Sequence, residues 1–398
     1  MKSKVLTGLE RLLTDPSLQK KFPGKIGYLC HAASVTPEIE HGLLALKRVF
    51  GDRLIKVFGP QHGFVTDVQD NMVESKHTIH PYFKLQVYSL YSETRIPTQE
   101  MLEGLDHVFV DLQDVGTRIY TYIYTMTYMM EACQKAGVQV VILDRPNPID
   151  GVTLEGNVLD MKFDSFVGRH PIPVRHGLTM GEVALMNKKF WTAPDCNLHV
   201  IEMKGWQRSM SYEDTNLPWV LPSPNLATIE AAYTFVGTVL FEGTNISEGR
   251  GSTRSLEIIG HPKIEAFSMH DRLKKVMKEE ELFGFVLRPL VFLPTFQKHQ
   301  GLPCGGFQIH VTDRQKFEPW RLCQTLCREL YRELGAEFKW KQPPYEYEYD
   351  RMPIDLINGT DKLRLWVEKN GSRSEYESIM KDGFADYVAK RKEILIYE

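Results

Sequence analysis

Short runs of apolar residues recur through the first part of the chain, each bounded by polar or turn-forming residues. They cover residues 25–31, 54–58, 107–114 and 138–144 and are rich in Val, Ile, Leu and Phe, which is typical of strands. The last two runs are continuously apolar, as expected when helices cover both faces of a parallel sheet. We therefore expect these four runs to be strands of one sheet.

Between these runs, apolar residues recur at the spacing of helices. The pattern predicts helices over 4–14, 37–50, 98–105 and 120–136, and Gly137 suits the end of the last one. Alternation of strands and helices is typical of parallel α/β sheets. We expect a Rossmann-like, mostly parallel sheet domain over residues 1–264.

From residue 265 the composition changes, and the pattern predicts a smaller α+β auxiliary domain over residues 265–398. Its first helix is strongly charged, and its second strand alternates cleanly between apolar and polar residues. The predicted elements are helices over 270–281, 317–335 and 374–394 and strands over 285–292 and 306–311.

Polar residues follow the predicted strands of the first domain. In open α/β sheets the carboxyl ends of parallel strands share one edge, and ligands bind there. The polar residues that this rule brings together are His31, Gln61, His62, Glu74, Gln113, Asp114, Arg118, Asp144, Arg145 and Asn147. This edge is the predicted site.

The segment 241–254, FEGTNISEGRGSTR, has neither helical nor strand periodicity. It concentrates carboxylates, guanidiniums and amides among glycines, which allow backbone to approach a ligand closely. Its candidate residues are Glu242, Asn245, Glu248, Arg250 and Arg254. The alternative is a solvated connector.

Structural alternatives exist for most of these residues. A histidine such as His62 can cap a turn, and Asp114 with Arg118 can form a purely structural ion pair. Asn147 lies between two prolines, where turn chemistry alone accounts for it. Tyrosines of the 120–136 helix either stack on a ligand or belong to the core.

Composition limits the classes of function. The 398 residues are 42% hydrophobic and 25% charged, with a net charge of −3, which creates no field that favours nucleic acid. No apolar run approaches the ~18 residues of a membrane span. The N-terminus lacks a signal-peptide core, so we expect a cytoplasmic protein, or a periplasmic or secreted one if a leader was removed.

Cofactor motifs are missing from the sequence. It has no G-x-G-x-x-G, P-loop, G-x-S-x-G or H-E-x-x-H, which disfavours nucleotide cofactors and α/β-hydrolase chemistry. The six cysteines are scattered without a C-x-x-C pair, as expected of reduced thiols rather than a metal site. Carboxylates and arginines without a cofactor fit a glycosidase acting on an anionic sugar. We expect no cofactor and no metal.

Several segments together resemble one known family, the exo-β-N-acetylmuramidase (NamZ-type) peptidoglycan hydrolases, over about residues 5–395. The resemblance implies a Rossmann-like domain and a smaller auxiliary domain, with the active site in the cleft between them. It implies release of N-acetylmuramic acid from the non-reducing ends of peptidoglycan fragments. The segments are GPQHG, VYSLYSETRIPTQEML, DLQDVGTRIYTYIYTM, LDRPNPIDG, EGNVLD, SFVGRHPIPVRHGLTMGE, LPWVLPSPNLAT, FEGTNISEGRGSTRSLEIIG and PTFQKHQG.

One position departs from the family pattern. The family carries a glutamate, its favoured catalytic acid, where this chain has Gln61, and an amide cannot act as a general acid. Another carboxylate (Glu74, Asp70 or Glu248) or His62 then supplies the proton. Otherwise the chain is a non-catalytic muropeptide-binding or sugar-binding protein, or a hydrolase for a different anionic sugar.

The resemblance leads to an assignment of residues. Glu248 or Glu74 is expected as acid/base, with Gln61, His62 and Asp114 close to the scissile bond. Arg118, Arg250 and Arg254 are expected to bind the negatively charged lactyl carboxylate of N-acetylmuramic acid. The remaining substrate-binding candidates are Tyr122, Asp144, Arg145, Asn147, Asn225, Glu242, Asn245 and His299.

Overall fold

The computed structural model describes residues 5–67, 69 and 74–398. Asp70, one of the carboxylates considered above, lies outside them. No helix in these ranges is long and apolar enough to cross a membrane.

The first unit is built on a seven-stranded sheet whose order is β3-β4-β2-β1-β5-β6-β9. All neighbouring pairs are parallel except β3 and β4, so the predicted Rossmann-like sheet is confirmed. The chain runs outward from β1 through β2 to β3 and β4, then crosses back to β5 on the other side of β1, which places a switch point beside β1. The strands are β1 (Ile26–Cys30), β2 (Leu54–Gly59), β3 (Thr78–Ile79), β4 (Gln86–Ser89), β5 (His107–Asp111), β6 (Gln139–Leu143) and β9 (Leu198–Ile201).

Helices cover both faces of this sheet, as the apolar strands predicted. Along β5, Val108 and Val110 belong to one buried cluster, whereas Phe109 belongs to another. Successive side chains of a strand point to opposite faces, so the two clusters are the cores on the two sides. The helices are α1 (Gly8–Thr14), α2 (Pro16–Gln19), α3 (Gly42–Phe50), α4 (Gln99–Leu102), α5 (Tyr122–Ala136) and α6 (Met180–Phe190). Short elements in this unit are η1 (Gly51–Arg53), β7 (Glu155–Val158), η2 (Met161–Phe163), β8 (Pro173–Arg175) and η3 (Tyr212–Thr215).

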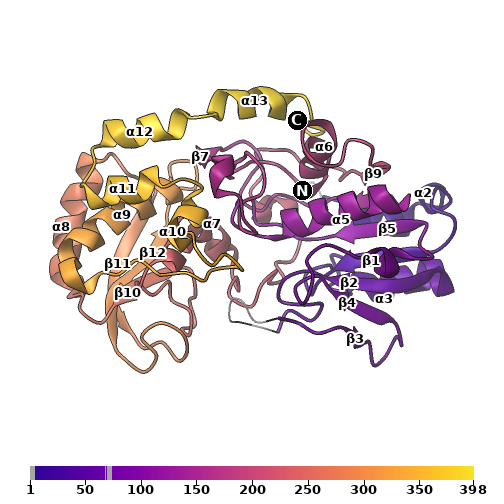
Figure 1. Ribbon diagram of the computed structural model, residues 1–398, viewed down its shortest axis with the longest axis horizontal. Helices are drawn as coiled ribbons and strands as arrows, with labels where there is room; N and C mark the ends of the chain where they lie inside the picture. The colour runs from indigo at the N-terminus through magenta and orange to yellow at the C-terminus, as the bar shows by residue number, and fades with distance from the viewer. Residues whose placement is uncertain (1–4, 68, 70–73) are drawn as a thin grey trace.

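The second unit holds an antiparallel sheet in the order β10-β12-β11, with helices packed around it (Figure 1). Its strands are β10 (Ile258–His261), β11 (Phe285–Phe292) and β12 (Cys304–Val311). Its helical elements are α7 (Ile229–Thr238), η4 (Val239–Gly243), α8 (Ala266–Glu279), α9 (Pro319–Leu334), η5 (Gly335–Glu337), α10 (Pro353–Asn358), α11 (Lys362–Glu368), α12 (Arg373–Lys381) and α13 (Phe384–Lys392). The helix expected over 374–394 is two helices, because Gly383 between them has φ 72°.

The border between the units was expected at 264/265, and strand pairing favours an earlier position. Strand β10 lies before residue 265 yet pairs with β12, and α7 packs against α9. We therefore propose that the second unit begins near residue 230. The end of the chain returns to the first unit, where the Tyr397 hydroxyl donates to Asp144 at 2.6 Å, and α13 lies near α6 (Figure 1).

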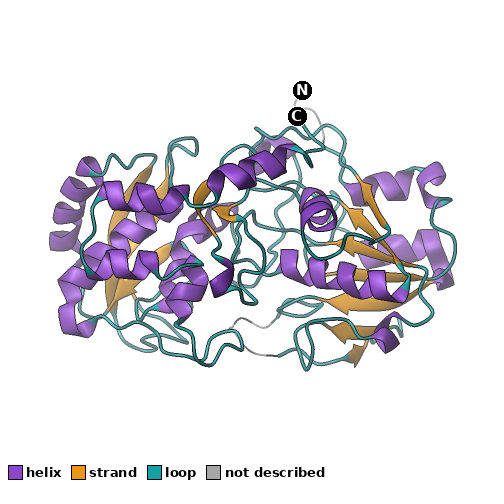
Figure 2. Cartoon of the chain, turned by 45° about the horizontal axis from the view of Figure 1, so that its top comes forward, coloured by secondary structure: helices purple, strands orange, loops and turns teal. Residues whose placement is uncertain are grey.

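Loops occupy much of the region between the two sheets (Figure 2). Several of these loops follow strands β2, β5 and β6 of the first sheet, as the carboxyl-edge rule predicted. They meet segments of the second unit there, and the candidate site forms at this meeting.

Candidate active site

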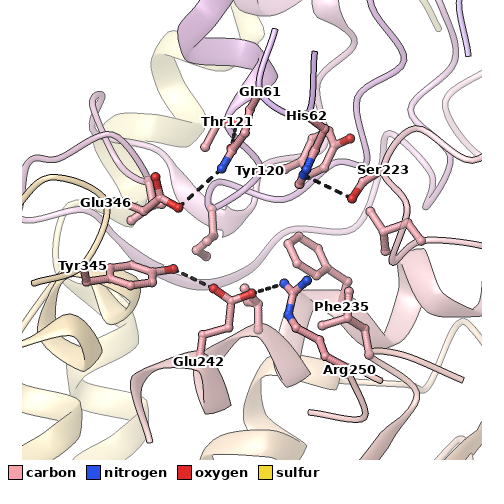
Figure 3. Close-up of a pocket in the computed structure, with 15 residues that line it drawn as sticks. Gln61, His62, Tyr120, Thr121, Ser223, Phe235, Glu242, Arg250, Tyr345 and Glu346 are labelled. Atoms are coloured by element: carbon pink, nitrogen blue, oxygen red, sulfur yellow. Dashed lines mark hydrogen bonds and ion pairs between the residues drawn. The ribbon is translucent and has the colours of Figure 1, made fainter. Parts of the chain in front are cut away.

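A pocket forms where loops of the first unit meet η4 and the segment 345–346 of the second (Figure 3). Apolar residues close part of its wall, among them Phe235 and Leu256. The polar side chains that line it are Gln61, His62, Tyr120, Thr121, Ser223, Glu242, Arg250, Tyr345 and Glu346. Four of the residues expected from the sequence are thus brought together: Gln61, His62, Glu242 and Arg250.

Gln61 follows β2 and is held in one orientation. The Thr121 hydroxyl donates to its Oε1 at 2.6 Å, so its Nε2 points the other way and donates to Glu346 Oε1 at 3.4 Å. The next residue, His62, has φ 67°, a left-handed conformation that is uncommon outside glycine. Its Nε2 lies 3.3 Å from the Ser223 hydroxyl. The turn therefore directs both side chains into the pocket.

Tyrosines of the 120–124 segment hold the loop that contains Pro222. The hydroxyls of Tyr120 and Tyr122 both donate to the Pro222 carbonyl, at 3.0 and 2.8 Å. Tyr122 also donates to the Gln61 carbonyl at 3.3 Å. Expected to bind substrate, Tyr122 instead ties together two loops that line the pocket.

Glu242 lies in η4, where it accepts hydrogen bonds from the Tyr345 hydroxyl at 2.8 Å and from the Arg250 guanidinium. Burial alone would raise the pKa of this carboxyl, but Arg250, Tyr345 and Lys298 outweigh that effect and lower it. Glu242 is therefore an ionised carboxylate inside the pocket.

Glu346 comes from the second unit and is a pocket residue that the sequence did not reveal. It is 4% exposed, and the Tyr91 hydroxyl donates to its Oε2 at 2.8 Å. Burial, reinforced by the nearby charge of Glu242, raises the pKa of Glu346 to about 7. The only signal in the sequence is the alternation of tyrosine and acid in YEYEYD (345–350), a period of two that an ordinary half-buried strand would also show.

Neither of the carboxylates expected as the acid lines the pocket. Glu248 is buried between Arg250 Nε at 3.0 Å and Lys298 Nζ at 2.7 Å, so it holds two cations in place. Glu74 is exposed and accepts a hydrogen bond from the Tyr347 hydroxyl at 3.1 Å. The geometry gives the acid role to neither residue.

Arg118 has a structural role rather than the expected contact with substrate. Its guanidinium is fully buried and donates to four backbone carbonyls, at 2.7–3.2 Å. Two of these carbonyls, those of Ile357 and Asn358, belong to the second unit. Arg118 therefore joins the two units through these carbonyls.

The residues expected after β6 are also structural. Arg145 pairs with Asp111, its Nη2 3.1 Å from Oδ2. Asp144 accepts from Thr179 and from the backbone of Gly181, both at 2.8 Å. Asn147 donates to the Leu178 carbonyl at 3.0 Å and caps its own proline turn. All three are buried: Arg145 fastens this loop to β5, whereas Asp144 and Asn147 fasten it to the start of α6.

The remaining candidates lie outside the pocket. Asp114 accepts from the Gly116 backbone at 2.7 Å and lies 3.3 Å from His176. Asn245 is held by the backbone of 337–339, and His299 contacts the Asn245 carbonyl at 2.6 Å. Asn225 and Arg254 line a second cavity together with other residues of the 251–257 loop, and the Arg254 side chain is 48% exposed.

Fold and site together define a class of protein. A two-unit α/β chain with two buried carboxylates in one pocket, one ionised and one with a raised pKa, has the groups that a glycoside hydrolase requires. Comparison with known proteins identifies the family. The N-terminal model of the exo-β-N-acetylmuramidase NamZ family matches residues 26–230 and the C-terminal model matches residues 233–397, so the chain belongs to this family.

Relatives match over the full length. The chain is 39% identical over 398 residues to the peptidoglycan β-N-acetylmuramidase NamZ of Bacillus subtilis (strain 168), covering 100% of this chain and 92% of that protein. Two crystal structures of DUF1343 family proteins from Bacteroides fragilis NCTC 9343 are each 27% identical. They superpose with TM-scores of 0.86 and 0.75, covering 99% and 100% of this chain and 99% of each of theirs. The resemblance and the two-unit fold predicted from sequence are confirmed.

Proposed function

We propose that this glycoside hydrolase cleaves β-N-acetylmuraminide bonds and releases N-acetylmuramic acid from the non-reducing ends of peptidoglycan fragments. The full-length similarity to the Bacillus subtilis β-N-acetylmuramidase is the observation that carries the proposal. The pocket supports it with groups suited to the chemistry. Its substrate would be a carbohydrate fragment, and no nucleic acid takes part.

Cleavage of a glycosidic bond passes through a state with positive charge on the anomeric carbon. The ionised Glu242 is a fixed negative charge that lowers the energy of such a state in a buried, weakly screened pocket. Because Arg250 and Tyr345 already hold this carboxylate, little reorganisation is needed when the charge develops.

The lactyl carboxylate of the sugar needs a cation that is not already neutralised. Arg250 is engaged by Glu242 and Glu248, and Arg118 by backbone carbonyls. Arg95 is different, because its Nε and Nη2 are buried without a hydrogen-bond partner among the described residues. The Tyr347 ring orients its guanidinium, 3.2 Å from the ring centre. Arg95 lies beside the pocket rather than in its lining, with its guanidinium 5.6 Å from the ring of Tyr91, which contacts Glu346. We assign recognition of the carboxylate to Arg95.

The test is hydrolysis of a chromogenic β-N-acetylmuraminide beside the matching β-N-acetylglucosaminide. The proposal expects cleavage of the first and little of the second. Tight binding of N-acetylmuramic acid without turnover would favour the sugar-binding alternative raised by Gln61. Cleavage of a different anionic glycoside alone would show that its sugar, and not N-acetylmuramic acid, is the one released.

We propose that the protein acts in the cytoplasm. Its six cysteines are all buried, free thiols, as expected in a reducing compartment, and its net charge is small. Cell fractionation followed by immunoblotting checks it.

A further inference from the structure

We propose that Glu346 is the general acid of this site and protonates the departing glycosidic oxygen, an assignment that rests on the proposed hydrolase function. As the bond between the anomeric carbon and the glycosidic oxygen breaks, the bonding pair stays on that oxygen. The oxygen takes the proton of Glu346, and the leaving sugar departs as a neutral alcohol. Water supplies the new hydroxyl of the released sugar, and the proton that water loses restores the Glu346 carboxyl.

The positions of the two carboxylates carry this inference. Among the described residues that line the pocket, Glu242 and Glu346 are the carboxylic side chains, and they project into it from different segments (Figure 3). Glycoside hydrolysis uses two carboxyl groups on opposite sides of the reacting bond. A carboxylate that contacts a guanidinium, as Glu242 does, is poorly suited to hold a proton.

The surroundings of Glu346 leave its pKa raised, although the two hydrogen bonds that it accepts act in the opposite direction. Tyr91 and the Gln61 amide, both neutral, contact its two oxygens. The charged groups that act on it are Glu242, which favours the protonated form, and Arg95, which opposes it more weakly. With burial as the largest cause, its pKa of about 7 keeps a substantial protonated fraction near neutral pH.

The backbone supports a functional role for the same residue. Glu346 and Tyr347 have φ values of 45° and 69°, so two consecutive residues other than glycine adopt the left-handed conformation. Such conformations persist where surrounding contacts impose them, and they concentrate at active sites. Here they aim Glu346 toward Gln61.

Gln61 explains why the acid comes from the second unit. A neutral amide cannot transfer a proton as a carboxylic acid does. Its Nε2 nevertheless lies 3.4 Å from Glu346 Oε1, so the two side chains reach nearly the same point in the pocket. A carboxyl group placed at position 61 is therefore expected to substitute for one lost at position 346.

The test uses Glu346→Gln and two β-N-acetylmuraminides, one with a sugar leaving group and one with dinitrophenolate, which departs without a proton. General acid catalysis contributes about 10²- to 10⁴-fold, so kcat/KM should fall by that factor for the first substrate and by less than about tenfold for the second. The matched control is Glu348→Gln, on the same segment but outside the pocket lining, paired with Arg351. It should leave both activities unchanged.

Two further measurements separate catalysis from structure. In the wild type, activity on the sugar leaving group should fall as pH rises through about 7, while activity on the dinitrophenyl substrate persists. The double variant Gln61→Glu with Glu346→Gln should regain at least tenfold over Glu346→Gln. The pH profile of the wild type is informative even if the variants fail to fold.

Some outcomes would overturn the assignment. Equal losses on both substrates in a folded Glu346→Gln variant, or the same high-pH limb for both substrates in the wild type, would exclude Glu346 while leaving the hydrolase function intact. A wild type that cleaves neither substrate would overturn the proposed function first, and this assignment with it.

Discussion

The Gln61 side-chain amide donates to Glu346 across 285 positions of the sequence, at 3.4 Å. This contact joins a loop of the parallel sheet to a loop of the second unit, inside the pocket. Neither unit supplies the site alone, because Gln61 and His62 belong to the first whereas Glu242, Arg250 and Glu346 belong to the second. Any motion that separates the units would therefore withdraw Gln61 and His62 from the two carboxylates.

Replacing Glu242 with Gln should reduce kcat by about 10²- to 10³-fold, because the variant loses the fixed charge that stabilises the developing cation. KM should change little. Initial rates on the chromogenic muraminide measure this, and thermal melting confirms that the variant folds.

Glu248→Gln is the matched comparison, since Glu248 also contacts Arg250 but does not line the pocket. It weakens the hold on Lys298 and should cost up to about 3 kcal/mol of unfolding free energy, while kcat stays within tenfold. Loss of turnover at unchanged stability would instead restore the catalytic role that the sequence suggested for Glu248.

Removing the Tyr91 hydroxyl should move the pH profile. Its hydrogen bond to Glu346 lowers the pKa of that carboxyl, so Tyr91→Phe raises it. A proton donor is active below its pKa, and the high-pH limb of kcat/KM on the sugar leaving group should therefore shift upward. A limb that stays in place, or moves to lower pH, would contradict this account of Glu346.

Arg95→Met should reduce discrimination between the two sugars. If the guanidinium holds the lactyl carboxylate, kcat/KM on the muraminide should fall by about 10- to 100-fold, with little change on the glucosaminide. Arg254→Met makes the same chemical change on an exposed arginine of the other cavity and should leave the ratio unchanged. An Arg95 variant with an unaltered ratio would exclude this recognition.

Much of the fold could be predicted because it depends on local pattern. Strands such as β5 are buried on both faces and so read as continuous apolar runs, and α5 ends where Gly137 is left-handed. The earlier border proposed here rests on the pairing of β10 with β12, a long-range contact that no local period reveals.

The site was predicted in part, for a related reason. Loops at strand ends and the glycine-rich segment supplied four of the residues that line the pocket, Gln61, His62, Glu242 and Arg250. The sequence cannot separate an arginine satisfied by carbonyls, such as Arg118, from one that awaits an anion, because both are polar residues near a strand end. Glu346 was missed because only tertiary packing brings it to the sheet edge.

Replacing Arg145 with Met should destabilise the protein rather than alter its chemistry. The variant leaves Asp111, which is fully buried, without its cation, and only the Tyr28 hydroxyl at 2.6 Å remains as a side-chain donor to it among the described residues. Removing one partner of a buried pair costs about 3–5 kcal/mol. Urea unfolding should show that loss, and the fraction that stays folded should cleave substrate with a kcat within about threefold of the wild type. A large fall in kcat at unchanged stability would return Arg145 to the substrate-binding role expected from the sequence.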